Sequence, residues 1–96
     1  MFDKMKQLMD MKKQAERIKR ELEALEVEAN DIDGITVKVN GTHRFQSIVI
    51  NESLLAPENK ARLENDLLKS VNAAIKKAEA IAAQKMKDVM PGFPGL

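Results

Sequence analysis

The middle of the chain carries the pattern of a β-hairpin, and this pattern limits the possible folds more than any other feature. Apolar and polar residues alternate over Ile35–Val39, Asn40-Gly41 follows, and a second apolar-rich run ends at Ile50. Asn-Gly is favoured in two-residue type I′ turns, because both central residues need positive φ. We therefore expect a tight hairpin in which Val39 lies opposite Thr42.

The same alternation assigns residues to the two faces of the hairpin. One face is predicted to hold the apolar residues Ile35, Val37, Val39, Ile48 and Ile50 and to be covered by helices. The other face is predicted to hold Thr36, Lys38, His43, Phe45, Ser47 and Val49. Because Phe45 and Val49 are apolar, they also need cover, which a second subunit would supply. We therefore expect both residues in a dimer interface.

Long amphipathic helices are predicted on either side of the hairpin. In the first, from Phe2 to about Glu26, apolar residues recur at spacings of three and four: Leu8, Met11, Ala15, Ile18, Leu22 and Leu25. This periodicity indicates a helix packed through one face on a sheet or a partner, or else a short coiled coil. The closing helix is predicted from Pro57 to about Met90 and would span roughly 45–50 Å. It is longer than a small sheet, so its far end should project.

The connecting segments are short. A strand at Val27–Ala29 is possible but not required by the pattern, and Asn51–Leu55 is predicted to form a single turn. Residues 1–90 are expected to form one domain, followed by a flexible Pro/Gly tail at residues 91–96. The predicted class is α+β.

Composition narrows the range of functions. The chain has 96 residues, three of them aromatic, and no cysteine, which excludes disulfides and thiolate metal sites. Such a thin core favours homodimerisation. The first residues, Met1–Lys6, lack the apolar stretch of a secretion signal, and no window is apolar enough to cross a membrane. We therefore expect a cytoplasmic protein with no membrane partner, metal, cofactor or small-molecule substrate.

Charge is distributed unevenly along the chain, although the net charge is only +1. Residues 1–20 carry seven Lys or Arg and three acids, whereas residues 21–33 carry six acids and no base. Residues 69–96 are again net positive, at +3. Basic segments at both helices indicate an anionic partner.

On a helical projection, the cations gather into ridges. The first helix carries Lys6, Lys12, Lys13, Lys19 and Arg20 together, with its acids mainly on another flank. On the closing helix, Arg62, Lys69, Lys76 and Lys87 lie opposite the apolar stripe, and Lys77 and Lys85 flank them. The simpler interpretation is that any amphipathic helix needs a charged outer face. Segregation of cations from acids favours binding to phosphates, and the lack of aromatic platforms favours duplex DNA over single strands.

We therefore predict DNA-binding residues on both helices: Lys6, Lys12, Lys13, Lys19, Arg20, Lys69, Lys76, Lys77 and Lys87. No zinc-finger spacing or aromatic RNA-binding strand is present, so binding to the backbone is expected to dominate over base readout.

Two other classes of function compete with this interpretation. An adaptor protein could use the methionines near the chain ends, Met1, Met5, Met9, Met11, Met86 and Met90, as an adaptable contact surface. An enzyme is the weakest alternative, since the single His43 has no evident acidic partner. Asp31 and Asp33 form only a fragment of a calcium loop and are interpreted as a turn. There is no glycine-rich phosphate loop.

Across almost its whole length the chain resembles the YbaB/EbfC family of nucleoid-associated proteins. The resemblance is most specific in the hairpin, which includes Gly34–Gly41, and in Ile50–Leu55. It extends to Ile48-Val49, to Val71-Asn72-Ala73-Ala74 and to the Pro/Gly-rich end. It implies an α-β-β-β-α fold and a bacterial homodimer whose paired sheets leave the helices projecting like tweezers. It also implies binding to DNA with a change in DNA conformation, in nucleoid organisation or gene regulation. Asn51-Glu52 departs from the Asp-Pro common in the family, which has no sharp DNA-contact motif.

Overall fold

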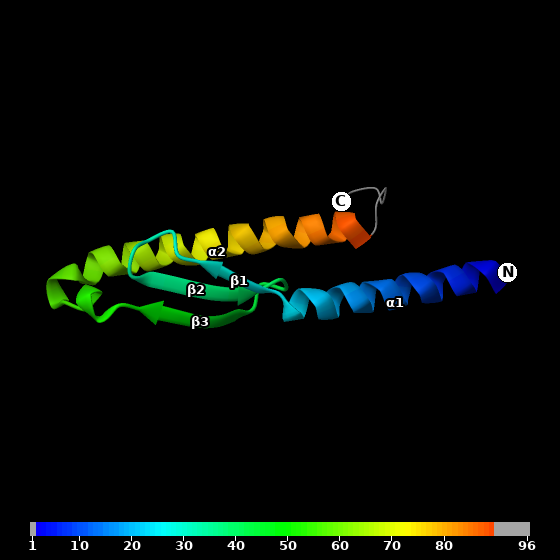
Figure 1. Ribbon diagram of the computed structural model, residues 1–96, viewed down its shortest axis with the longest axis horizontal. Coiled ribbons are helices and arrows are strands. Elements are labelled where there is room, and N and C mark those ends of the chain that lie inside the picture. Colours follow the sequence, from blue (N-terminus) through cyan, green and yellow to red (C-terminus); the bar gives the residue numbers. More distant parts are fainter. Residues whose placement is uncertain (1, 90–96) are drawn as a thin grey trace.

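A computed structural model describes residues 2–89, and it confirms the predicted α+β fold with its short first strand (Figure 1). In chain order the elements are α1 (Phe2–Ala24), β1 (Glu26–Ala29), β2 (Ile35–Asn40), β3 (Phe45–Ile50), the 3₁₀ turns η1 (Glu52–Leu54) and η2 (Pro57–Asn59), and α2 (Lys60–Val89). The single turn after β3 is thus also confirmed. The predicted tail at residues 91–96, with Met1 and Met90, lies outside the described residues.

The sheet is antiparallel, with β2 between β1 and β3, and α2 lies across β1 and β2. The core between α2 and these strands consists of Val27, Ala29, Ile35, Val37, Val39, Ala74 and Ala78. Ala74 and Ala78 are fully buried, so the small side chains of α2 let its backbone approach the sheet closely. The predicted grouping of apolar residues on one face is confirmed, since Ile35 pairs with Ile50 and Val37 with Ile48. The predicted cover of this face by helices does not extend to Ile48, which is 46% exposed.

Strand β3 is left largely uncovered because α2 crosses the other two strands. Ile48 is 46% exposed and Val49 is 60% exposed, although they occupy successive positions on the strand. Successive side chains point to opposite faces. Apolar surface is therefore open on both faces of β3, which is also an edge of the sheet.

The hairpin turn differs from the prediction. Val39 is aligned with Phe45 instead of Thr42, and the strands are joined by a loop in which Gly41 lacks positive φ. His43 carries the positive φ, 66°. A two-residue turn does not form, because the Gly41 amide is engaged by the carbonyl oxygen of Leu22 in α1 at 2.8 Å. The type I′ prediction and its register were therefore wrong.

The expected faces of β3 hold only in part. A register shift between Lys38 and Val39 separates the aligned pairs Lys38–Ser47 and Val39–Phe45. Phe45 is thus aligned with an inward-facing residue, which corrects its placement beside Thr36 and Lys38. Val49 is aligned with Thr36 and thus lies on the same face as Thr36, as predicted.

Most of helix α1 does not pack on the sheet of its own chain, which leaves packing on a partner or in a coiled coil as the open alternatives. Among its described apolar residues only Ile18 is buried, whereas Met5, Leu8 and Met9 are each more than 60% exposed. The helix ends at Ala24, two residues early, and Glu26 pairs with Asn40. Helix α2 begins at Lys60 because Pro57–Asn59 form a tighter turn.

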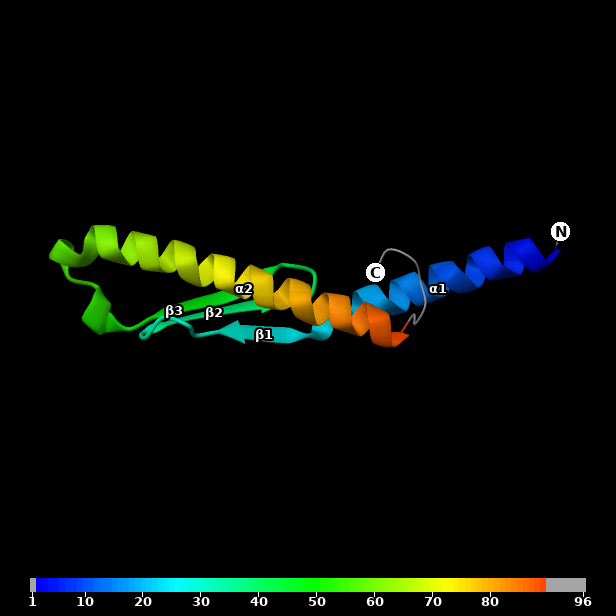
Figure 2. The ribbon, with the colours of Figure 1, turned by 90° about the horizontal axis from the view of Figure 1, so that it is seen from above.

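Both helices extend in the same direction beyond the sheet, as Figures 1 and 2 show from two sides. The molecule is accordingly elongated, measuring 68 × 20 × 17 Å. The Lys85 Nζ of α2 lies 3.6 Å from the Glu21 Oε2 of α1 and links the two helices where they diverge from the sheet. The predicted projection of the closing helix is thus observed, and α1 projects farther.

Candidate nucleic-acid interface

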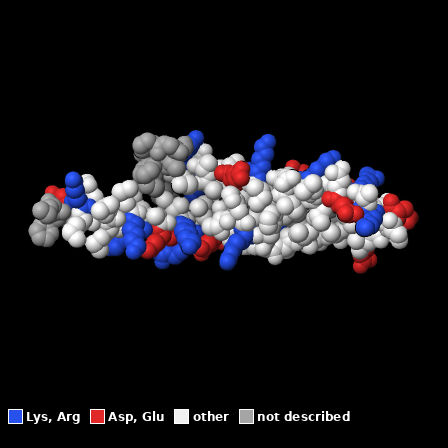
Figure 3. Space-filling view, turned by 180° about the vertical axis from the view of Figure 1, so that it is seen from behind, with Lys and Arg blue, Asp and Glu red and all other residues white. Residues whose placement is uncertain are grey.

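The first group of predicted DNA-binding residues lies on the exposed surface of α1. Lys6, Lys12, Lys13, Lys19 and Arg20 are all exposed. Figure 3 shows Lys and Arg side chains along this helix, with several acidic side chains among them, while the middle of the same view is nearly free of charge. The helix that stands farthest from the body is thus also rich in accessible cations.

Acids accompany the cations at the end of α1 nearest the body. Lys19 and Arg20 line an open hollow together with Glu16 and Glu23. Arg17 pairs with Glu21 at 3.6 Å, within reach of the next helical turn. The predicted segregation is therefore incomplete here, and Lys6, Lys12 and Lys13 occupy the part of α1 beyond this acidic end.

The second group lies on α2. Lys69, Lys76 and Lys87 are exposed on this helix. The Lys77 Nζ donates a hydrogen bond of 2.7 Å to the backbone oxygen of Glu28 in β1. Lys77 thereby helps to attach α2 to the edge of the sheet, so its cation is less available to a ligand than that of Lys76.

One exposed cation close to α1 was not among the predicted residues. Arg44 lies in the loop between β2 and β3, whose Gly41 contacts Leu22 near the end of α1. The sequence feature that could have pointed to Arg44 is the absence of any acid from Gly34 to Asn51. Arg44 was not predicted because it lies outside both helices, and its loop meets α1 only through a tertiary contact.

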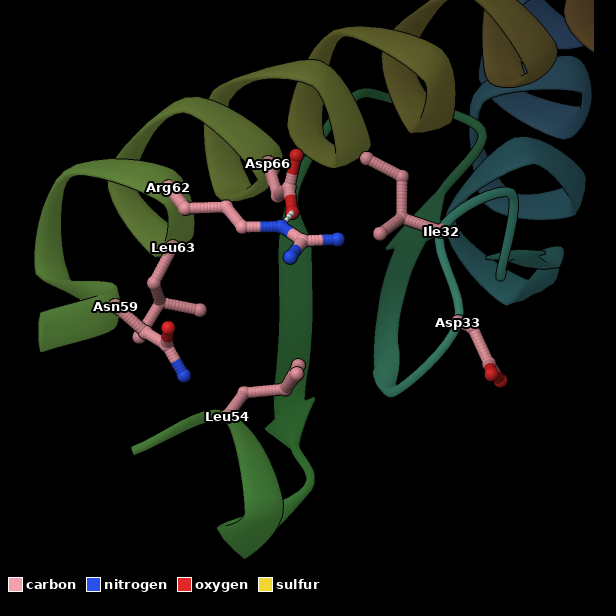
Figure 4. A pocket seen from close by; sticks show the side chains of 7 residues that line it. All are labelled: Ile32, Asp33, Leu54, Asn59, Arg62, Leu63 and Asp66. Atoms are coloured by element: carbon pink, nitrogen blue, oxygen red, sulfur yellow. Dashed lines mark ion pairs between the residues drawn. The ribbon is translucent and has the colours of Figure 1, made fainter. Parts of the chain in front are cut away.

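A hollow of about 240 Å³ lies at the opposite end of the molecule, where α2 begins (Figure 4). It is lined by Ile32, Asp33, Leu54, Asn59, Arg62, Leu63 and Asp66. Arg62 Nε lies 3.8 Å from Asp66 Oδ2, and the Asp33 carboxylate points away from the hollow in Figure 4. The two central charges of the hollow, Arg62 and Asp66, thus pair with each other. The lining residues place no nucleophile next to a base.

Two further observations bear on the class of protein. Within residues 2–89 no group of three or more His, Cys, Asp or Glu side chains is arranged to hold a metal ion. Over the same part of the chain, neither helix has the length and apolar character required to cross a bilayer.

A basic helix projecting from a small α-β-β-β-α body defines a candidate nucleic-acid-binding protein. The chain belongs to the YbaB/EbfC DNA-binding family, which it matches over residues 1–93. It is 34% identical over 93 residues to a nucleoid-associated protein of Chloroflexus aurantiacus, covering 96% of this chain and 93% of that protein. It is 37% identical over 99 residues to a nucleoid-associated protein of Alkaliphilus metalliredigens, covering 100% and 87%.

The fold is shared with a solved structure. The crystal structure of an uncharacterized protein from Helicobacter pylori superposes with a TM-score of 0.72 at 20% identity, covering 94% of this chain and 97% of the other. The resemblance to the YbaB/EbfC family is confirmed by the family match and the nucleoid-associated relatives. The solved structure shows that the fold is shared.

Proposed function

We propose that this protein binds duplex DNA in the nucleoid as a homodimer, with little dependence on base sequence, and alters the conformation of the bound DNA. The observation that carries the proposal is the position of α1 in a chain of a DNA-binding family. This helix stands away from the body and exposes Lys6, Lys12 and Lys13 to solvent. A projecting cationic helix can approach a phosphate backbone without obstruction by the sheet.

The chemistry of the exposed surface favours phosphates over bases. Lysine ammonium groups attract phosphates as point charges, and the release of counterions from the duplex provides most of the affinity. Among the side chains that the structure describes, Phe45 is the one aromatic residue, and it is 44% exposed. A single ring offers little of the stacking surface that single-stranded nucleic acids require.

Uncovered apolar surface supports the homodimer. Ile48, Val49 and Phe45 on β3 are between 44% and 60% exposed. Leu68 of α2 is also 60% exposed and lies beside the half-buried Leu67 and Val71 in an open apolar hollow. A second copy of the chain packed along β3 would bury this surface and cover the free edge of the sheet.

The proposal is tested by the fluorescence anisotropy of two labelled duplexes of unrelated sequence, titrated with protein across a salt series. We expect similar affinities for the two duplexes and a linear decrease of log K with log salt concentration. Light scattering during size-exclusion chromatography gives the mass of the same preparation, and we expect twice the mass of one chain. Absence of binding to both duplexes at low salt would refute the DNA-binding function.

The exposed methionines of α1 favour a second candidate, an adaptor for another protein. Met5 is 66% exposed, Met9 is 61% exposed and Met11 is 46% exposed. Flexible thioether side chains can repack against partners of different shape. A protein captured by the tagged chain in high salt after nuclease treatment, and released by Met5→Gln/Met9→Gln substitution, would support this function.

A further inference from the structure

The loop between β2 and β3 has an internally bonded backbone. The Asn40 amide nitrogen donates to the Arg44 carbonyl oxygen at 2.9 Å, and the His43 amide nitrogen donates to the Asn40 carbonyl oxygen at 3.1 Å. With positive φ at His43, this is the pattern of a three-residue hairpin loop. The loop therefore holds a defined shape.

The side chain of Asn40 stabilises the loop by hydrogen bonds to Thr42 and Arg44. Its Oδ1 accepts hydrogen bonds from the Thr42 amide at 3.0 Å, the Thr42 hydroxyl at 2.8 Å and the Arg44 amide at 2.9 Å. Asn40 is only 6% exposed. The backbone of Arg44 is thus fixed on both sides of its Cα, while its side chain is exposed to solvent.

The same loop is attached to the end of α1. The Gly41 amide donates to the Leu22 carbonyl oxygen at 2.8 Å, and the Asn40 Nδ2 donates more weakly to the Glu23 carbonyl oxygen at 3.4 Å. These carbonyl groups belong to the last turn of α1, and the Leu22 oxygen also accepts a hydrogen bond from the Leu25 amide at 3.2 Å. Loop and helix therefore form one continuous surface where α1 leaves the body.

The electrostatic setting of Arg44 differs from that of two other cations near the end of α1, one on α1 and one on α2. Arg17 and Lys85 both pair with Glu21, each at 3.6 Å. By contrast, none of the ion pairs found among residues 2–89 includes Arg44. Its own hairpin contains no acid, and His43 is exposed beside it. A guanidinium can donate two parallel hydrogen bonds to one phosphate, which an ammonium group cannot do.

We propose that the β2–β3 loop is a third DNA-contacting element, in which Arg44 binds a backbone phosphate beside the end of α1 that carries Lys19 and Arg20. This inference rests on the proposed DNA-binding function and extends it to a residue outside both helices. The loop supplies a rigid backbone, a position beside α1 and a cation without an acidic partner among the described residues. Phosphate is the ligand that suits these three properties together.

The test compares Arg44→Ala with the wild type in the anisotropy titration across a salt series. Alanine retains the amide and carbonyl groups that form the loop, so circular dichroism melting should be nearly unchanged. We expect several-fold weaker binding and a salt slope reduced by about 0.9 for each phosphate that is no longer neutralised. Arg44→Lys should retain part of the affinity, because it keeps the charge and removes the paired donors.

Lys60→Ala is the control for loss of charge, since it also removes one positive charge, in this case one that pairs with Glu64 at 4.0 Å. Lys60 is exposed at the start of α2, at the end of the molecule away from the loop (Figure 1). Equal effects of Arg44→Ala and Lys60→Ala, or no effect of Arg44→Ala on a wild type that binds DNA, would overturn the inference and leave the proposed function intact. A wild type that fails to bind either duplex would overturn both.

Discussion

The amide nitrogen of Gly41 lies 2.8 Å from the carbonyl oxygen of Leu22, and a Cβ added at Gly41 would lie 2.7 Å from that same oxygen. The glycine is therefore required by the close approach of α1, since its φ is not positive. This single contact explains why the Asn-Gly pair forms a different turn from the one its sequence favours. It also attaches the last turn of α1 to the loop.

Gly41→Ala is expected to push the last turn of α1 away from the loop. The loop conformation itself tolerates alanine, so the cost comes from the clash with backbone atoms of Leu22. We expect a decrease of about 1–3 kcal/mol in the free energy of unfolding. Thermal unfolding followed by circular dichroism would measure it. An unchanged or raised melting temperature would contradict the close approach.

The packing of α2 on the sheet depends on alanine at its inner face. Ala78 is fully buried, so Ala78→Leu should overpack the core and cost about 1–3 kcal/mol. Ala83 is exposed on the same helix, and Ala83→Leu serves as the control with little expected effect. Urea denaturation of the two variants gives the comparison. Equal stability of both would mean that α2 does not lie against β1 and β2 as described.

The role of α1 in DNA binding is tested by Lys13→Ala/Arg20→Ala. Both residues are exposed, so the fold should be unaffected. Removing two phosphate-binding cations from each chain should reduce the salt slope by about 1.8 per chain and weaken binding at low salt. Anisotropy titration measures both quantities, with Lys60→Ala as the charge control. Unchanged affinity and slope would remove α1 from the interface.

A negative charge introduced on β3 tests whether this strand forms the proposed dimer interface. Val49 is 60% exposed in the single chain, so Val49→Asp should leave that chain folded. Buried in an interface, the unpaired carboxylate would oppose association strongly. We expect light scattering to show one chain for Val49→Asp and two chains for the control Ala61→Asp, whose site is exposed on α2. A Val49→Asp dimer would exclude β3 as the interface.

Local patterns predicted the helices and strands well. The alternation over β2 and the three-four spacing in α1 indicate which residues share a face, and that information is contained in neighbouring positions. Element boundaries deviated by a few residues at Ala24 and Lys60. The position of each end depends on competition between helix, strand and turn conformations, and the local sequence pattern does not determine its outcome.

The cationic residues were also identifiable from sequence, because charged side chains on an amphipathic helix must lie outside its apolar stripe. The acids beside Lys19 and Arg20 were not foreseen. Nor was the hydrogen bond from Lys77 to the backbone of Glu28, since these residues lie 49 positions apart. Such pairings require the spatial arrangement of elements that the sequence does not bring together.

By itself, the sequence determined the order of the long helices and the hairpin, the apolar face of β2 and the positions of the cations on the helices, since each follows from periodicity within one segment. Only the tertiary structure decided the register of the hairpin, the direction of α1 and the exposure of β3. These depend on contacts between distant segments, above all between Gly41 and Leu22 and between α2 and the first two strands. There the packing of whole elements outweighs the local preference of two residues for a tight turn.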